Sequence, residues 1–167
     1  MSKINNLTKG GIFTALTLIC IYLSSIVTTN KLFLLGAASC IIPLSILTTD
    51  IKNSIIVYGA SSLLSFILVP RGAALAYLLF FGSYGFIKYY VERLRKLPIE
   101  IFLKLAFFNT CFYVVLKLYS LLFTGMFKIN IPIYYMVIML QVIFLIYDYA
   151  LTVFIAYVNT RILKKTI

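Results

Sequence analysis

The sequence predicts an all-α, polytopic membrane protein: a single domain over residues 1–167 with six transmembrane helices and both termini in the cytoplasm. Hydrophobic residues make up 63% of the chain and charged residues 11%, whereas soluble domains carry roughly 25% charged residues. So few polar residues cannot cover a water-soluble core. The Lys and Arg residues lie mainly between the apolar stretches, a distribution that orients proteins in bilayers. The net charge of +11 is therefore attributed to membrane orientation and not to nucleic-acid binding.

Apolar stretches long enough to cross a bilayer recur along the chain. Crossing about 30 Å of hydrocarbon takes roughly 20 apolar helical residues. The last stretch is too long for one untilted span and too short for two spans with a loop. It predicts either one long tilted helix or a helix broken near Asp148. The predicted spans are Gly11–Thr28, Leu32–Thr49, Ser54–Pro70, Ala73–Tyr90, Ile101–Thr124 and Ile131–Leu163.

The distribution of the basic residues supports six spans. With an even number of spans, eleven of the 15 Lys and Arg residues fall on the side that holds both termini. Only Lys31, Arg71 and Lys128 fall on the opposite side, and Lys117 lies within a span. Cytoplasmic loops of membrane proteins are enriched in Lys and Arg, so this asymmetry places both termini in the cytoplasm.

The segment "KYYVERLRKLPIEIFLK" is the longest predicted cytoplasmic connection. Its apolar residues Val91, Leu94 and Leu97 recur every three positions. This spacing predicts an amphipathic helix that ends at a bend near Pro98. Its cations are expected to face lipid headgroups or a partner protein.

Asp148 is one of only four acidic residues, and it lies inside the last apolar stretch. A charge at this depth is costly and needs a partner. Depth matching along the helices favours Lys104, or the basic residues after the fourth span, and Tyr147 or Tyr149 as neighbours. Two roles remain open: a structural ion pair that ties the last helix to the cytoplasmic side, or a role in transport or coupling.

A second intramembrane charge, Lys117, belongs to a polar stripe on the fifth span. Asn109, Tyr113, Lys117 and Ser120 recur at helical spacing and share one face. The stripe predicts a solute pocket, with Gln141 from the sixth span and Arg71 at its mouth. A cationic, outward-facing pocket suits a small anionic solute. The alternative is that Lys117 extends to the outer headgroups and that the stripe only packs.

No arrangement of residues predicts catalysis or a bound metal or cofactor. The chain has no His, and its three Cys residues lie far apart within apolar stretches. Zinc and haem sites need closely spaced Cys or His ligands, so the sequence predicts neither an enzyme nor a cofactor-binding protein.

The first span, in "KGGIFTALTLI", carries Gly11 and Ala15 four positions apart. Small residues at this spacing allow close helix–helix contact in lipid, either within the chain or with another subunit.

With this first helix, its basic N-terminus and six short spans, the chain resembles the substrate-capture subunits (S components) of energy-coupling factor vitamin transporters. In that family, small residues of an AxxxA-like motif contact the transmembrane coupling subunit, and Gly11 and Ala15 stand at the matching positions. The resemblance implies a bacterial plasma-membrane protein that binds a small vitamin-like solute and delivers it through a coupling subunit driven by two ATPases. The segment "PRGAALAYLLFFGSYGFIKYYVERL" also resembles uncharacterised small membrane proteins of Firmicutes.

A different class remains open beside this one. A non-transporting membrane scaffold or regulator of a cell-envelope complex, such as the shape-determining protein MreD, has a similar size and number of spans. A bound metabolite after purification would favour capture, and co-purification with an envelope subunit would favour the scaffold.

Overall fold

The computed structural model describes residues 3–27, 29–94, 96–122 and 133–162. These residues are almost entirely helical, and no strand occurs among them. Helices are the expected solution for an apolar chain, because every backbone group in lipid must find its hydrogen bond within the protein. The helical segments are α1 (Lys3–Ile26), α2 (Lys31–Thr48), α3 (Ile51–Leu68), α4 (Arg71–Ala76), η1 (Tyr77–Phe81), α5 (Gly82–Glu92), α6 (Leu97–Leu122), α7 (Ile133–Tyr157) and η2 (Val158–Ile162).

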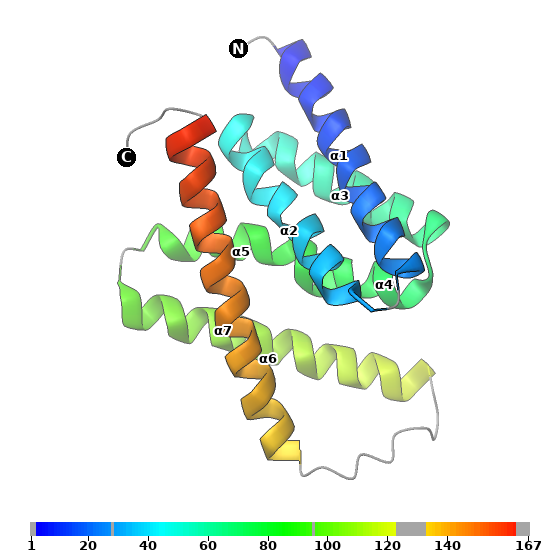
Figure 1. Cartoon of the computed structure of the whole chain (residues 1–167), viewed down its shortest axis with the longest axis vertical. Helices are drawn as coiled ribbons and strands as arrows, with labels where there is room; N and C mark the ends of the chain where they lie inside the picture. Colours follow the sequence, from blue (N-terminus) through cyan, green and yellow to red (C-terminus); the bar gives the residue numbers. More distant parts are fainter. Residues whose placement is uncertain (1–2, 28, 95, 123–132, 163–167) are drawn as a thin grey trace.

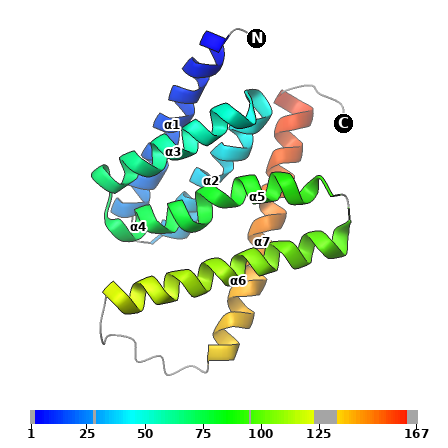
Figure 2. The ribbon, with the colours of Figure 1, turned by 180° about the vertical axis from the view of Figure 1, so that it is seen from behind.

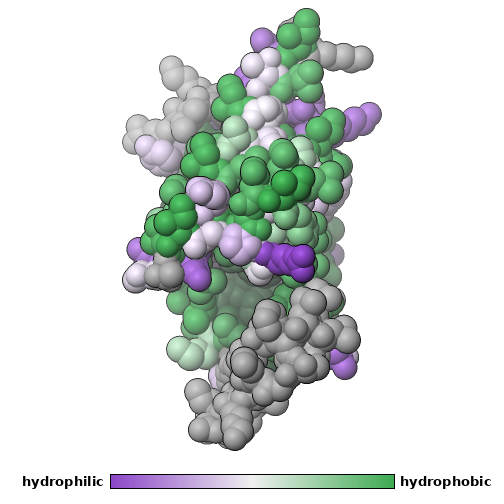
Figure 3. Space-filling model, turned by 90° about the vertical axis from the view of Figure 1, so that its right-hand side faces the viewer, coloured by the Kyte–Doolittle hydropathy of each residue, from purple (hydrophilic) through white to green (hydrophobic). Residues whose placement is uncertain are grey.

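Five of these helices, namely α1, α2, α3, α6 and α7, are long and apolar enough to cross a membrane. The fourth predicted span falls on α4, η1 and α5, which follow one another without a gap from Arg71 to Glu92. The all-helical, membrane-spanning class is therefore confirmed, whereas the number six and the cytoplasmic placement of the termini stay predictions. Figure 3 shows one largely hydrophobic face of the molecule, on which hydrophilic residues form small separate patches.

The helices run back and forth between two ends of the molecule (Figure 1). In Figure 1 α1 starts at the top, the α2–α3 connection and the end of α7 lie at the upper left, and the α5–α6 connection lies at the left edge. The α1–α2 and α3–α4 connections lie toward the right. Helix α7 crosses both α5 and α6 instead of lying alongside them, as the view from behind also shows (Figure 2).

The last apolar stretch forms one helix through Asp148. Helix α7 is continuous from Ile133 to Tyr157, and the π-helical segment η2 extends it to Ile162. The prediction of one long helix is thus confirmed over these residues, and a break near Asp148 does not occur. The amphipathic helix with a bend at Pro98 is wrong: α5 ends at Glu92, and Pro98 is the second residue of α6. Proline is tolerated in a first turn, because its missing N–H would have no partner there.

Hydroxyl groups join the helices in the interior. Ser45 of α2 bonds Ser54 of α3 at 2.9 Å, and Ser61 of α3 bonds Tyr77 of η1 at 3.0 Å. Hydroxyl side chains commonly link membrane helices in this way. The contacts tie α2, α3 and η1 into one unit around the buried residues Ile21, Leu35, Ala38, Val69, Tyr77 and Phe81.

The π-helical segment η1 breaks the regular hydrogen bonding of the α4–α5 run, and side chains bond its carbonyl groups. The Tyr58 hydroxyl donates to the Leu78 carbonyl at 2.7 Å. The Leu79 carbonyl accepts hydrogen bonds from Ser83 at 2.7 Å and Cys111 at 3.2 Å. Short π-helical segments often occur next to functional sites. Here η1 is followed directly by α5, which carries two of the four charged residues of the candidate site.

Candidate functional site

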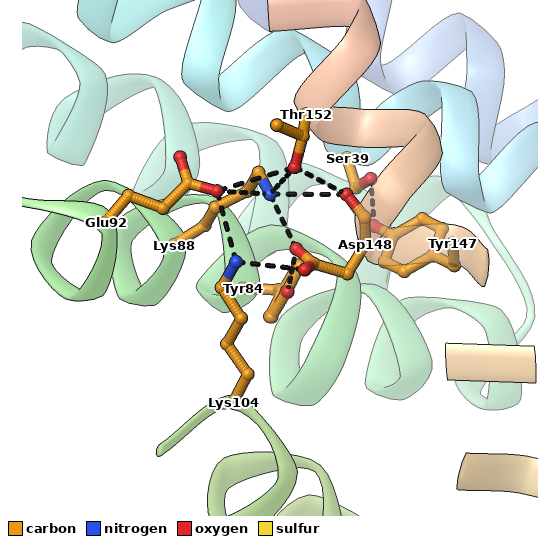
Figure 4. A network of polar contacts seen from close by, with 8 residues as sticks. All are labelled: Ser39, Tyr84, Lys88, Glu92, Lys104, Tyr147, Asp148 and Thr152. Atoms are coloured by element: carbon orange, nitrogen blue, oxygen red, sulfur yellow. Dashed lines mark hydrogen bonds and ion pairs between the residues drawn. The ribbon is translucent and has the colours of Figure 1, made fainter. Parts of the chain in front are cut away.

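Four charged side chains meet between α5, α6 and α7, and we call them the charge quartet: Lys88, Glu92, Lys104 and Asp148 (Figure 4). Lys88 and Glu92 lie four positions apart on α5, so they share one face of that helix. Lys104 comes from the second turn of α6, and Asp148 comes from the middle of α7. The quartet holds two ammonium groups and two carboxylates, so its net charge is zero.

Lys88 is the most buried member of the quartet, with 1% of its side chain exposed. Its Nζ lies 2.6 Å from Glu92 Oε1 and 2.5 Å from Asp148 Oδ1. It also donates to the Thr152 hydroxyl at 2.7 Å. Three side-chain acceptors therefore surround one ammonium group, which matches its three donors.

Lys104 closes the quartet from α6. Its Nζ lies 2.9 Å from Asp148 Oδ2 and 3.1 Å from Glu92 Oε1. Each carboxylate therefore contacts both ammonium groups. The Tyr84 hydroxyl adds a hydrogen bond to Asp148 Oδ1 at 2.5 Å. Charges removed from water are stable only when such partners replace the lost hydration, so the quartet locks α5, α6 and α7 together.

Aromatic rings pack beside the charge quartet, on the side of Tyr84. Phe80 is their centre, and its ring centroid lies between 5.1 and 6.3 Å from six others. Such distances are typical of favourable aromatic pairs. The rings exclude water from this side of the quartet and strengthen its electrostatic contacts. The six are Phe81, Tyr84, Phe107, Phe108, Phe144 and Tyr147.

The structure brings Asp148 and Lys104 together, the pair that the sequence singled out. It also brings in Lys88, Glu92 and Tyr84, which the sequence did not assign to the site. Lys88 lies in the last turn of the fourth predicted span, whereas depth matching pointed to Lys104 or to the basic residues after that span. The tyrosine whose hydroxyl bonds Asp148 is Tyr84, whereas Tyr147, one of the two expected neighbours, bonds Ser39 of α2, and Tyr149, the other, is 72% exposed.

A hydrogen bond links the polar stripe of α6 to α7. Gln141 Nε2 donates to Asn109 Oδ1 at 3.2 Å. Further along the same face, Lys117 Nζ lies 5.7 Å from the centre of the Tyr113 ring. Tyr113 is 61% exposed. The side chain of Ser120 lies outside the described part of the structure.

Arg71 is not joined to this stripe. It begins α4 and is exposed, and among the described residues none links it to Asn109, Tyr113 or Gln141 by a hydrogen bond or ion pair. A shared pocket mouth at Arg71 therefore stays a prediction.

Gly11 and Ala15 lie on an exposed face of α1. A Cβ atom added at Gly11 would meet no other atom within 4 Å, whereas one added at Gly10 would lie 3.0 Å from the Asn53 side chain. The two neighbouring glycines thus differ in role. Gly10 allows α1 to approach α3, and Gly11 faces away from the rest of the chain.

No group of three or more Cys, Asp and Glu residues that could hold a metal ion occurs among the described residues. Comparison with protein-family models, with curated proteins and with solved structures finds no match for the chain.

Proposed function

We propose that the chain is a membrane-embedded substrate-binding subunit, which takes up a small anionic solute together with a separate ATP-driven coupling module. The observation that carries the proposal is the hydrogen bond between Gln141 and Asn109. It joins the polar stripe of α6 to α7 in otherwise apolar surroundings. Binding sites in membrane transporters are built from polar groups of neighbouring helices, and intramembrane cations mark solute pathways.

In this proposal Lys117 supplies the charge that the solute recognises, and Asn109, Tyr113 and Gln141 orient the solute by hydrogen bonds. The phenylalanines near Asn109 on α6 and α7 supply apolar walls; Phe108 and Phe144 stack there with ring centroids 4.7 Å apart. Pockets for small molecules combine such apolar walls with a few polar groups. Arg71 would attract the anion from the loop side.

The resemblance to S components also assigns a role to the exposed face of α1. Gly11 and Ala15 would contact the coupling subunit, and the open space at Gly11 supports a close approach of a partner helix. The charge quartet fits this proposal as a fixed brace, because all four of its charges already have partners.

The test is to identify small molecules that co-purify with the detergent-solubilised protein by mass spectrometry, and then to measure their binding to variants. Lys117→Ala is expected to abolish binding of an anionic solute while the melting temperature changes little. Lys31→Ala removes an exposed cation at the start of α2 and serves as the matched control. Unchanged binding by Lys117→Ala would contradict the proposal.

One observation favours a scaffold as the second candidate. In the most apolar stretch of α6 only 6% of the residues are buried, against 44% in α2. Helix α6 therefore offers a long apolar side to lipid or to another membrane protein. A scaffold would purify without any small molecule and only as a complex with a cell-envelope subunit. Its assembly would not respond to Lys117→Ala.

A further inference from the structure

We propose that the cavity between α2, α5 and α7 binds a phosphate-bearing anionic headgroup, which Arg93 contacts directly. The cavity has a volume of about 400 Å³. It borders the charge quartet through Lys88 and Glu92, and Arg93, the residue after the end of α5, also lines it. The inference does not depend on the proposed solute site, which involves α6 and other residues of α7.

Among the charged residues that line the cavity, Arg93 carries a positive charge that the other charges do not balance. Lys88 and Glu92 line the cavity, but their charged groups are engaged within the neutral charge quartet. Arg93 is exposed, and no described residue forms an ion pair with it. The cavity wall therefore carries one uncompensated positive charge on a side chain that is free to turn toward a ligand.

The identity of that side chain favours phosphate. A guanidinium group presents two parallel N–H donors, which match the oxygen atoms of a phosphate. Tyr89 also lines the cavity, and none of the described residues accepts a hydrogen bond from its hydroxyl. It can donate a further hydrogen bond to the same phosphate.

The remaining wall favours a lipid as the source of the phosphate. Pro43 and Leu47 of α2 and Ile155 of α7 form an apolar side of the cavity. A ligand that fills the cavity thus meets one basic end and one hydrocarbon surface. Anionic phospholipids have this combination, and basic residues at the membrane boundary attract them. A soluble phosphate ester has the anionic group that would meet the basic end, but it lacks the hydrocarbon chain that would meet the apolar side.

The experiment uses the full chain in detergent and native mass spectrometry with added phosphatidylglycerol or phosphatidylcholine. Wild-type protein is expected to retain phosphatidylglycerol preferentially. Arg93→Gln should retain it about fivefold less well, as expected for the loss of one basic contact at a membrane surface. Arg93→Lys should lie between the two, because it keeps the charge but loses the paired donors.

Lys96→Gln is the matched control, because Lys96 is an exposed cation near Arg93 that does not line the cavity. Leu47→Trp fills the apolar side without changing any charge, and it should also reduce retention. An equal loss in Arg93→Gln and Lys96→Gln would overturn the proposal, because it would show non-specific attraction by the basic segment. Equal retention of both lipids would overturn it as well.

Two further arms distinguish the source of the phosphate. Inorganic phosphate and glycerol 3-phosphate are added in competition with phosphatidylglycerol. No displacement at millimolar concentration is expected, and this result supports a lipid. Displacement that depends on Arg93 supports the phosphate site and assigns it to a soluble ester.

Discussion

Lys88 and Asp148 are 60 positions apart in the sequence, yet Lys88 Nζ lies 2.5 Å from Asp148 Oδ1. The contact joins α5 to α7. Glu92 contacts Lys88, and Lys104 contacts both Glu92 and Asp148. An intramembrane carboxylate therefore acts here as the point where three helices meet. The contribution of each member of the charge quartet to the stability of the protein can therefore be measured by substituting it.

Asp148→Leu is expected to destabilise the protein by about 3–5 kcal/mol, because it leaves two buried ammonium groups with the one carboxylate of Glu92 and puts no hydrogen-bond acceptor in the place of the lost carboxylate. Asp148→Asn should cost less, about 1–3 kcal/mol, because its amide oxygen can still accept hydrogen bonds from Tyr84 and Lys88. Thermal unfolding in detergent, followed by circular dichroism, measures both. An equal loss in the two variants would mean that hydrogen bonding contributes nothing to the site.

Lys104 and Glu92 are expected to be energetically coupled. Lys104→Met alone or Glu92→Gln alone unbalances the charge quartet by one charge. The double variant restores the balance, so its loss of stability should be smaller than the sum of the two single losses, by about 0.5–3 kcal/mol. Additive losses in the same unfolding assay would show that the 3.1 Å contact between them carries no coupling.

Gly85→Ala is expected to destabilise the packing of α5 on α2. A Cβ atom at this position would lie 2.9 Å from Ile42 Cγ2 and 3.0 Å from Pro43 Cδ. Overpacking of this kind costs about 1–3 kcal/mol. Gly59→Ala on α3 is the control, because its Cβ would meet nothing within 4 Å. It should be neutral or more stable by up to about 1 kcal/mol, through helix propensity alone.

Cysteine labelling in intact cells tests the predicted orientation. In a background in which Cys20, Cys40 and Cys111 are replaced by alanine, Arg71→Cys should react with a membrane-impermeant reagent and Lys52→Cys should not. Lys52 is the second residue of α3, next to the α2–α3 connection, and Arg71 is the first residue of α4, next to the α3–α4 connection. These two connections lie at opposite ends of α3 (Figure 1). The reverse pattern would place both termini outside, and labelling of both would contradict the predicted spans between them.

The helices could be predicted from the sequence because hydrocarbon thickness alone fixes their approximate length. The partner Lys104 could be predicted for Asp148 because depth along a helix follows from its rise per residue. Lys88, Glu92 and Tyr84 were missed for a different reason. Their spacing on α5 shows that they share a face, but only tertiary packing decides that this face meets Asp148. The sequence does not show where α5 and α7 cross. Without that information, Lys88 cannot be distinguished from an ordinary cation at the membrane boundary.

The π-helical segment η1 and the crossing of α6 by α7 also had no signal in the sequence. Hydropathy reports how apolar a stretch is, but neither its hydrogen-bond register nor its direction relative to other helices. The bend at Pro98 was expected because proline interrupts helix interiors. It was wrong because the chain turns earlier, after Glu92, and α6 begins just before the proline.

The order in which the members of the charge quartet occur in the chain has a consequence for biosynthesis. Lys88, Glu92 and Lys104 are synthesised before Asp148, so a chain that ends before α7 holds two ammonium groups and only one carboxylate in lipid. Such an intermediate lacks the second carboxylate that balances its two ammonium groups, and the translocon or a chaperone would have to protect it until Asp148 is synthesised. A truncation after Leu122 should therefore be degraded rapidly, and Lys104→Met should prolong its lifetime. The synthesis of α7 would then be the step that completes the charge quartet and ends the need for this protection.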